Sequence, residues 1–178
     1  DAVYQTTVGD NRVRMASVLT IAMNRADIII TSGGLGPTQG DITKEVTAEV
    51  LGLPMYLHEE SVAHIKGFFE RRHLTMTQNN LRQAMMPEGA IVVTNHRGTA
   101  PGVIIEHEEK TIIHLPGPPM ELEHMFENSI LPYFSNRFGS QGLIVSKVLR
   151  TFGLGESSME ERIRDYILAQ KNPTLALL

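Results

Sequence analysis

The sequence contains no cysteine among its 178 residues. Disulfide bonds, thiolate zinc sites, iron–sulfur clusters and cysteine nucleophiles are therefore all excluded. It also lacks any apolar run near the roughly 20 residues that a membrane-spanning helix needs, and it does not open with a basic-then-apolar signal sequence. From these absences we expect a cytoplasmic protein that has no membrane partner.

Positive charge is in short supply as well. Lys and Arg total 16 against 20 Asp and Glu, which gives a formal net charge of −4. A general nucleic-acid binder or membrane-surface binder needs dense positive charge, so neither class fits. The content of 42% hydrophobic and 20% charged residues instead indicates an ordinary globular protein.

Segments of strand character alternate with segments of helical periodicity. Between Arg12 and Asn24 apolar residues recur at spacings of three and four, which predicts a helix with one buried stripe. Asp27–Thr31 is a β-branched run, typical of a parallel strand that is covered on both faces. The fold class we predict is an α/β three-layer α/β/α sandwich with a mostly parallel sheet. Further strands are expected at 2–8, 91–93, 102–106 and 111–115, and further helices at 43–51, 59–72, 77–86 and after Pro118.

A smaller unit is expected after the polar, glycine-containing stretch Ser135–Gly142. We predict that it holds a strand at 143–152, a helix with Met159 and Ile163 on its apolar face, and a last strand at 174–178. A β-α-β piece of this size is not stable alone. It must therefore dock on the main domain or on another chain.

The strongest chemical signal is the loop Ser32–Thr38, which contains three glycines and lies between an expected strand and an expected helix. Ligands of open α/β sheets bind at the carboxyl ends of the strands. Glycines let backbone N–H groups approach an anion closely, and the following helix adds partial positive charge. The loop predicts a phosphate site, with a simple tight turn as the alternative; its glycine order is neither a dinucleotide fingerprint nor a P-loop.

Asp41 follows this loop. A carboxylate beside an anion site repels the ligand unless a cation lies between them or the carboxylate handles protons. Asp41 is therefore predicted to hold a divalent metal or to activate a water. The alternative is that it caps the N-terminus of the next helix.

Two more loops rich in glycine and proline, Arg97–Gly102 and Leu115–Glu121, adjoin expected strands. We expect all three loops to meet at one edge of the sheet and to build one pocket. Arg97 is the expected phosphate ligand, because a planar guanidinium bridges two oxygens; a solvated surface position is the alternative. The seven histidines include no HxH or HxxxH pair, so we expect them on the surface or in packing roles.

These loops carry a resemblance to a known family. The segments Ser32–Thr38 with Asp41–Glu45, Gly98–Gly102 and Leu115–Pro119 resemble the three loops of the CinA (competence- and damage-inducible) family. The likeness runs from about Tyr4 to the end of the chain and includes Leu149–Ser157 and Asn172-Pro173-Thr174. More distantly, the glycines followed by Asp41-Ile42-Thr43 resemble the molybdopterin-binding fold of MogA, MoaB, gephyrin and MoeA.

The resemblance implies a molybdopterin-binding-type domain over residues 1–138, without the family's first strand and helix, then a partial KH-like segment over 139–178. It implies hydrolysis of a nucleotide-type small molecule, ADP-ribose, to AMP and ribose 5-phosphate. The implied cofactor is a divalent metal, Mg²⁺ or Co²⁺, with K⁺ as a further candidate cation. Two alternatives remain: a pterin-binding adenylyltransferase domain of molybdenum-cofactor biosynthesis, and a non-catalytic scaffold that dimerises for a nicotinamide-nucleotide deamidase. In either case we expect a homodimer.

The loops and the resemblance together give the expected site residues. Asp41 is the expected catalytic residue and metal ligand. Gly40 stands where family members usually carry a second acid, which lowers the metal affinity that we expect. The expected phosphate and nucleotide ligands are Ser32, Gly33, Gly34, Gly36, Thr38, Thr43, Glu45, Arg97, Gly98, Thr99, Ala100, Gly102, Pro116, Gly117, Pro118 and Pro119.

Overall fold

The computed structural model describes residues 3–139 and 145–177. The chain divides into two compact units, Asp1–Ser140 and Gln141–Leu178, and each is described by itself. The first unit contains α1 (Arg12–Arg25), β1 (Ile28–Ser32), α2 (Thr43–Leu51), β2 (Met55–Leu57), α3 (Glu59–Arg71), the 3₁₀ helix η1 (Gln78–Ala84), β3 (Met85–Pro87), β4 (Ile91–Val93), β5 (Gly102–His107), β6 (Lys110–Leu115), α4 (Pro119–Met125), the π-helical turn η2 (Phe126–Ile130) and α5 (Leu131–Phe138).

The main sheet has four strands in the order β1-β6-β5-β4. β1 runs parallel to β6, whereas β6 pairs antiparallel with β5 and β5 with β4. The α/β class is confirmed, but the sheet is mixed rather than mostly parallel. The physical reason is the tight turn at Glu108-Glu109, with Glu108 at φ 53°, because a connection of two residues can join only antiparallel strands.

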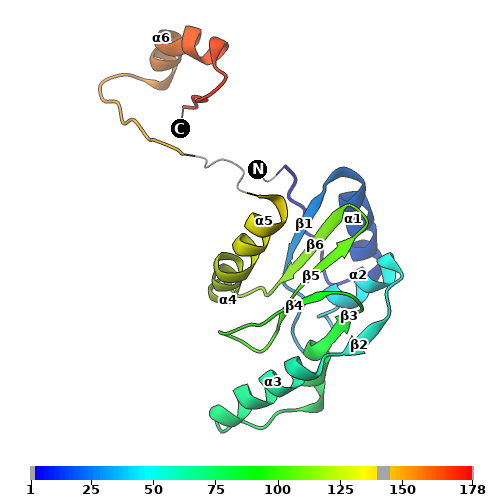
Figure 1. Cartoon of the computed structure of the whole chain (residues 1–178). Helices are drawn as coiled ribbons and strands as arrows, with labels where there is room; N and C mark the ends of the chain where they lie inside the picture. Colours follow the sequence, from blue (N-terminus) through cyan, green and yellow to red (C-terminus); the bar gives the residue numbers. More distant parts are fainter. Residues whose placement is uncertain (1–2, 140–144, 178) are drawn as a thin grey trace. The chain divides into compact units, whose positions relative to one another are not determined.

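The sheet separates two apolar cores. One contains Ile105 and Ile112 and packs against α1 and α2, and the other contains Ile104 and Ile113 and packs against α4 and the following helices. Figure 1 shows these two groups of helices on opposite sides of the sheet. Successive strand residues point to opposite faces, so the alternating use of neighbouring isoleucines confirms the three-layer arrangement.

β1 departs from the expectation of a strand covered on both faces. Ile29 is buried at 8% exposure, but Ile28 is 38% and Ile30 is 45% exposed. Among the described residues β1 has one neighbour, β6, and it lies at an edge of the sheet. The helices on the Ile113 side therefore leave the outer face of this strand partly open.

Two other expected elements differ in the structure. The β-prone residues 3–8 form no strand; Arg25 holds this segment by lying 4.0 Å above the Tyr4 ring and donating to Thr6 Oγ1 at 3.1 Å. The helix expected at 77–86 is the 3₁₀ helix η1 followed by β3, which pairs with the unexpected strand β2. Asn80 Oδ1 accepts from the backbone N and Oγ1 of Thr77, both at 2.9 Å, and this tightens the first turn.

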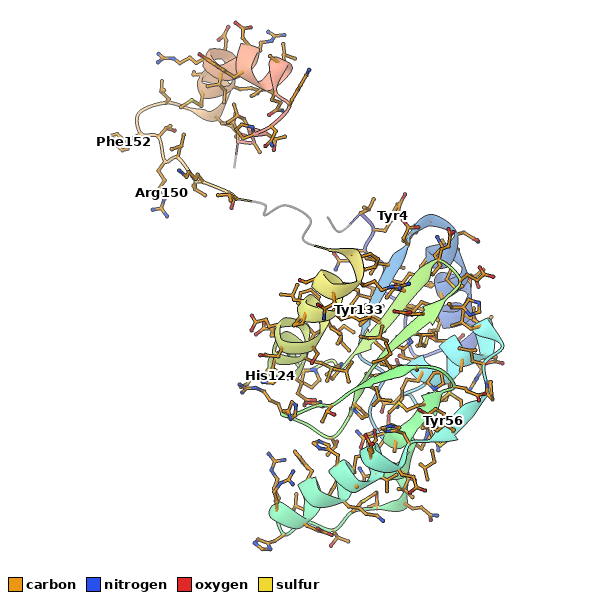
Figure 2. The ribbon with its side chains drawn as sticks, in the orientation of Figure 1. Tyr4, Tyr56, His124, Tyr133, Arg150 and Phe152 are labelled. Carbon is orange, nitrogen blue, oxygen red and sulfur yellow. The ribbon has the colours of Figure 1, made fainter. Side chains whose placement is uncertain are left out.

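The second unit contains α6 (Glu156–Ala169). The described residues 145–152 and 174–177 form no strand, and the rest of those two expected strands lies outside the described residues. Figure 2 shows Phe152 standing away from the ribbon, in agreement with its full exposure. Met159 and Ile163 are half-buried and α6 contains no buried residue. The docking expected of this unit, on the main domain or on another chain, and the expected homodimer both stay predictions. In the part of the chain that the structure describes, no helix is long and apolar enough to cross a membrane.

Replacement of Ile112 tests the core between the sheet and α1. This side chain has no exposed surface, so Ile112→Ala should leave a cavity and lower the free energy of unfolding by about 2–5 kcal/mol. Ile91→Ala is the matched control, because Ile91 is 47% exposed and should lose less than about 1 kcal/mol. Urea unfolding followed by circular dichroism measures both variants. Equal losses would contradict this burial pattern.

Candidate functional site

The three glycine- and proline-rich loops meet at the carboxyl ends of β1 and β6. Because these strands are parallel, the segments that follow them leave the sheet at the same edge. The backbone N of Gly33 donates to the Leu115 carbonyl at 2.9 Å. A cavity of about 280 Å³ lies between the loops. Its lining residues are Gly33, Gly34, Leu35, Gly36, Asp41, Gln83, Thr99, Ala100, Pro116, Gly117, Pro118 and Glu121.

The first loop requires glycine for its backbone conformation. Gly33 and Gly34 have φ values of 96° and 70°, in the left-handed region that other residues rarely adopt. A Cβ on Gly34 would overlap Thr43 Oγ1. Thr43 itself is buried, donates through Oγ1 to the Gly33 carbonyl at 3.1 Å, and donates through its backbone N to Gly34 at 3.2 Å. Thr43 thus braces the loop and does not line the cavity.

Asp41 closes the loop with its carboxylate. Oδ2 accepts from the backbone N of Thr38 at 2.8 Å and from Thr38 Oγ1 at 2.6 Å. Partial burial raises the pKa of Asp41, but the hydrogen bonds from Thr38 and Gly36 and the charge of Arg82 outweigh it and hold that pKa below its ordinary 3.8. The N-cap alternative is wrong, because α2 has Ile42 at that position and no side-chain cap. Asp41 is therefore an ionised carboxylate on the cavity wall.

Arg82 connects the loop that contains Asp41 to α2, and it is not among the site residues expected from the sequence. Its guanidinium donates to the Thr38 carbonyl at 3.0 Å, to Gln39 Oε1 at 3.3 Å and to Glu45 Oε1 at 3.2 Å. Glu45 is thereby an ion-pair partner of Arg82, outside the cavity lining. No local motif marks Arg82, since its partners lie about forty positions earlier in the chain.

Asp10 is a second acid beside this loop; the segment Gly9-Asp10-Asn11 is typical of a turn and a helix start, and α1 begins directly after it. A Cβ placed on Gly40 would lie 3.3 Å from Asp10 Oδ2. The carboxylate therefore occupies the space next to Gly40, one residue from Asp41. The segment before α1 thus places an acid next to the loop, at an exposed position outside the cavity lining.

The second and third loops are joined through Asn95 and Glu121. Asn95 is buried at 2% exposure, and its Nδ2 donates to Glu121 Oε2 at 2.6 Å and to the Ala100 carbonyl at 3.0 Å. Arg97 is exposed and does not line the cavity, so the structure supports the solvated alternative for this residue. A Cβ on Gly102 would overlap Met125 Sδ, which makes that glycine a packing requirement.

The structure thus divides the expected site residues into two groups. Those that line the cavity are Gly33, Gly34, Gly36, Asp41, Thr99, Ala100, Pro116, Gly117 and Pro118. Those outside its lining are Ser32, Thr38, Thr43, Glu45, Arg97, Gly98, Gly102 and Pro119. Three lining residues were not expected: Leu35, Gln83 and Glu121.

A buried lysine lies behind cavity-lining Gln83. Lys44 is 2% exposed, and its Nζ donates to the Gln83 backbone carbonyl at 2.7 Å. Burial lowers the pKa of Lys44 to about 8. The pKa of fully buried His114 is lowered to about 3 by burial and then by the charge of Lys44, so this ring is neutral. Its Nδ1 lies 2.7 Å from Thr31 Oγ1, which is a packing role of the expected kind.

Across residues 3–139 and 145–177 there is no group of three His, Cys, Asp or Glu side chains placed to hold a metal ion. His124 projects from α4 (Figure 2), and its ring lies edge-on to His96 with 6.1 Å between centroids. A metal ion bound to the described residues would therefore have fewer than three such side chains as ligands, together with oxygens of the bound molecule or of water.

Comparison with known proteins gives matches over both units. Residues 1–136 match the family described as "Probable molybdopterin binding domain", and residues 146–178 match "Damage-inducible protein CinA KH domain". CinA-like proteins of Dictyoglomus turgidum and Dictyoglomus thermophilum are 52% and 51% identical over 173 residues, 97% of this chain. The chain spans 42% of the length of each. The crystal structure of CinA from Thermoplasma acidophilum matches with a TM-score of 0.63 and 31% identity, over 69% of this chain and 72% of that one.

The pKa of Lys44 predicts a stability change with pH. Between about pH 8 and pH 10.5 the unfolded chain holds the Lys44 proton and the folded chain does not, so the free energy of unfolding rises with pH through this group. As the pH rises through that window, the free energy of unfolding of the wild-type protein should therefore increase relative to that of Lys44→Met. Urea unfolding measures both. Lys66→Met, at an exposed position, is the control and should run parallel to wild type. If the difference in free energy of unfolding between wild type and Lys44→Met does not change with pH, the pKa of Lys44 is not lowered.

Proposed function

The chain belongs to the family of CinA-like proteins, with a molybdopterin-binding-type domain followed by a CinA KH domain, and from that premise we propose that its first unit is a metal-assisted hydrolase of ADP-ribose. The reaction adds one water across the P–O–P bond and releases AMP and ribose 5-phosphate. The observation that carries the proposal is the position of ionised Asp41 on the same cavity wall as the Gly33–Gly36 backbone.

The glycine loop supports the anion-binding part of the proposal. Gly33, Gly34 and Gly36 present backbone to the cavity with no side chain in the way. The Gly33 N–H donates to the Leu115 carbonyl and the Gly36 N–H to Asp41. The N–H groups between them, ahead of the N-terminus of α2 (Thr43–Leu51), suit a diphosphate. The neighbouring loop adds Gly117, where a Cβ would lie 3.5 Å from Gly33 Cα. This close approach lets the backbone of both loops reach one ligand.

The charge state of Asp41 favours metal binding over proton transfer. A general base works best with a pKa near the operating pH, and the pKa of Asp41 lies below 3.8. Its Oδ2 is held by Thr38, and the residue lines the cavity. Mg²⁺ is commonly held by one or two carboxylates plus phosphate oxygens, so Asp41 together with the phosphates of the ligand suits that ion. When bound, such a cation neutralises charge that develops on the phosphate oxygens.

The second candidate function is binding of a pterin phosphate in the same cavity. The description of the matched family, which names molybdopterin, favours it. Both ligands carry phosphate, so the glycine loop alone does not separate them. The two candidate ligands differ in the part other than the phosphate, which is a nucleoside in one and a pterin in the other.

Replacement of Asp41 tests the hydrolase. Asp41→Asn keeps the shape and removes the charge, so AMP release from ADP-ribose with Mg²⁺ or Co²⁺ should fall by about 100-fold or more, the scale of losing one electrostatic stabiliser. AMP is measured by chromatography, with thermal unfolding as a check of the fold. The matched control is Asp165→Asn, an exposed aspartate of α6, which should keep the wild-type rate. An unchanged rate in Asp41→Asn would remove this residue from the mechanism.

Thermal shifts separate the two candidate ligands. A ligand stabilises the folded state by RT ln(1 + [L]/Kd), so the tighter ligand gives the larger rise in Tm at equal concentration. We expect ADP-ribose with Mg²⁺ to raise the Tm more than molybdopterin does. EDTA should reduce the rise with ADP-ribose, because a bound cation would offset the repulsion between the Asp41 carboxylate and the diphosphate. A larger rise with molybdopterin would instead support the pterin function.

A further inference from the structure

The cavity lining combines backbone N–H donors with side-chain acceptors. The donors belong to the Gly33–Gly36 segment, where the N–H groups of Gly33 and Gly36 are already paired with Leu115 and Asp41. The acceptors are the side chains of Gln83 and Glu121, which come from η1 and α4. Gln83 lies outside the three expected loops and Glu121 ends the third, but neither was an expected site residue, and the proposed hydrolysis has no step that uses them.

Glu121 is held in place by a buried network. Its Oε2 accepts from Asn95 Nδ2, and Asn95 Oδ1 in turn accepts from the backbone N of Arg97 at 3.0 Å and of Gly98 at 2.8 Å. With Ala100 as the second acceptor for Nδ2, both donors of this amide are used. A Cβ on Gly98 would overlap the Glu121 carboxylate. The second loop is therefore shaped around this carboxylate, which keeps one oxygen for a ligand.

Gln83 is fixed from two sides. Its backbone carbonyl accepts from Lys44 Nζ at 2.7 Å, and its side-chain Nε2 donates to Thr99 Oγ1 at 3.0 Å. The side chain is 2% exposed, and within the described residues Oε1 is buried without a hydrogen-bond partner. A buried acceptor without a donor is costly to leave unpaired. A ligand that brings a donor to this oxygen would recover that cost.

We propose that Glu121 and Gln83 form a subsite that binds hydrogen-bond donors of the ligand, its hydroxyl or amino groups. The inference rests on the proposed function, in which the phosphates lie against the glycine loop. A carboxylate accepts from two adjacent donors and forms stronger hydrogen bonds than a neutral acceptor. Its charge also disfavours a phosphate next to Glu121. Together the glycine loop and these two side chains favour one orientation of the ligand in the cavity.

Affinity measurements with two probes test the subsite. The probes are ADP-ribose, as the analogue with a methylene group in place of the bridging oxygen so that it is not hydrolysed, and inorganic pyrophosphate, each with Mg²⁺, titrated by calorimetry into the whole chain. In Glu121→Gln the amide oxygen would face the donor of Asn95, and its NH₂ would face the donors of the ligand. ADP-ribose affinity should therefore fall by about tenfold or more. Pyrophosphate affinity should stay within about twofold of wild type or increase, because pyrophosphate has no hydroxyl or amino donor.

Gln83→Leu is the second variant and should show the same split between the probes. The matched controls are Glu123→Gln on α4 and Gln78→Leu on η1, both at exposed positions outside the cavity lining, and both should bind either probe like wild type. Parallel losses for ADP-ribose and pyrophosphate, or unchanged ADP-ribose affinity in both cavity variants, would overturn the subsite. Wild-type protein that binds no ADP-ribose would overturn the proposed function and the subsite with it.

Two analogues identify the donor. One lacks both hydroxyls of the adenosine ribose, and the other carries inosine, which has no exocyclic amino group. The analogue that lacks the recognised donor should bind wild type less tightly than ADP-ribose does. In Glu121→Gln the same analogue and ADP-ribose should bind equally, since the contact is already lost. If both analogues bind wild type as ADP-ribose does while Glu121→Gln still weakens ADP-ribose binding, the recognised donors are the hydroxyls of the terminal ribose, which both analogues keep.

Discussion

The hydrogen bond from the backbone N of Gly33 to the Leu115 carbonyl fixes the geometry on which the cavity depends. It continues the parallel pairing of β1 with β6 by one residue beyond the strands. Because of it, the first and third loops begin side by side and turn away from the sheet together. The antiparallel strands β4 and β5 then bring the second loop to the same edge. One parallel pair is enough for this purpose, so the site does not need the mostly parallel sheet that the sequence suggests.

Charged side chains from several elements surround the first loop. Arg82 from η1 reaches the carbonyl of Thr38 and the carboxylate of Glu45, while Thr38 donates twice to Asp41. A loop of this composition is flexible by itself, since glycine costs the most conformational entropy on ordering. The guanidinium and the carboxylate hold it in one conformation from both ends. Rigid donors that need no reorganisation are what electrostatic stabilisation of an anion requires.

Local patterns in the sequence predict the helices and strands with strong periodicity or clear stop signals. The helix at 43–51 has its expected bounds because Gly52 takes the left-handed C-cap conformation, with φ 67°. The prediction of a helix at 77–86 was wrong because Met85–Pro87 pairs with the distant residues Met55–Leu57. Local propensity does not report such a tertiary contact. The same distinction explains the site. Asp41 follows a recognisable loop, whereas Arg82 and Gln83 reach the site through contacts about 15 to 45 positions apart.

The hydrogen-bonding capacity of the cavity also follows from tertiary contacts rather than from motifs. Gln83 and Glu121 belong to different elements, and no spacing rule relates them. They line the same cavity because Thr99 accepts from the amide of Gln83 while Asn95 donates to Glu121, and both partners belong to the segment between β4 and β5. This segment thus holds two acceptors at the cavity whose lining also includes the backbone of the glycine loop. A cavity lined by both donors and acceptors suits a ligand that is anionic at one part and rich in hydroxyl or amino groups at another.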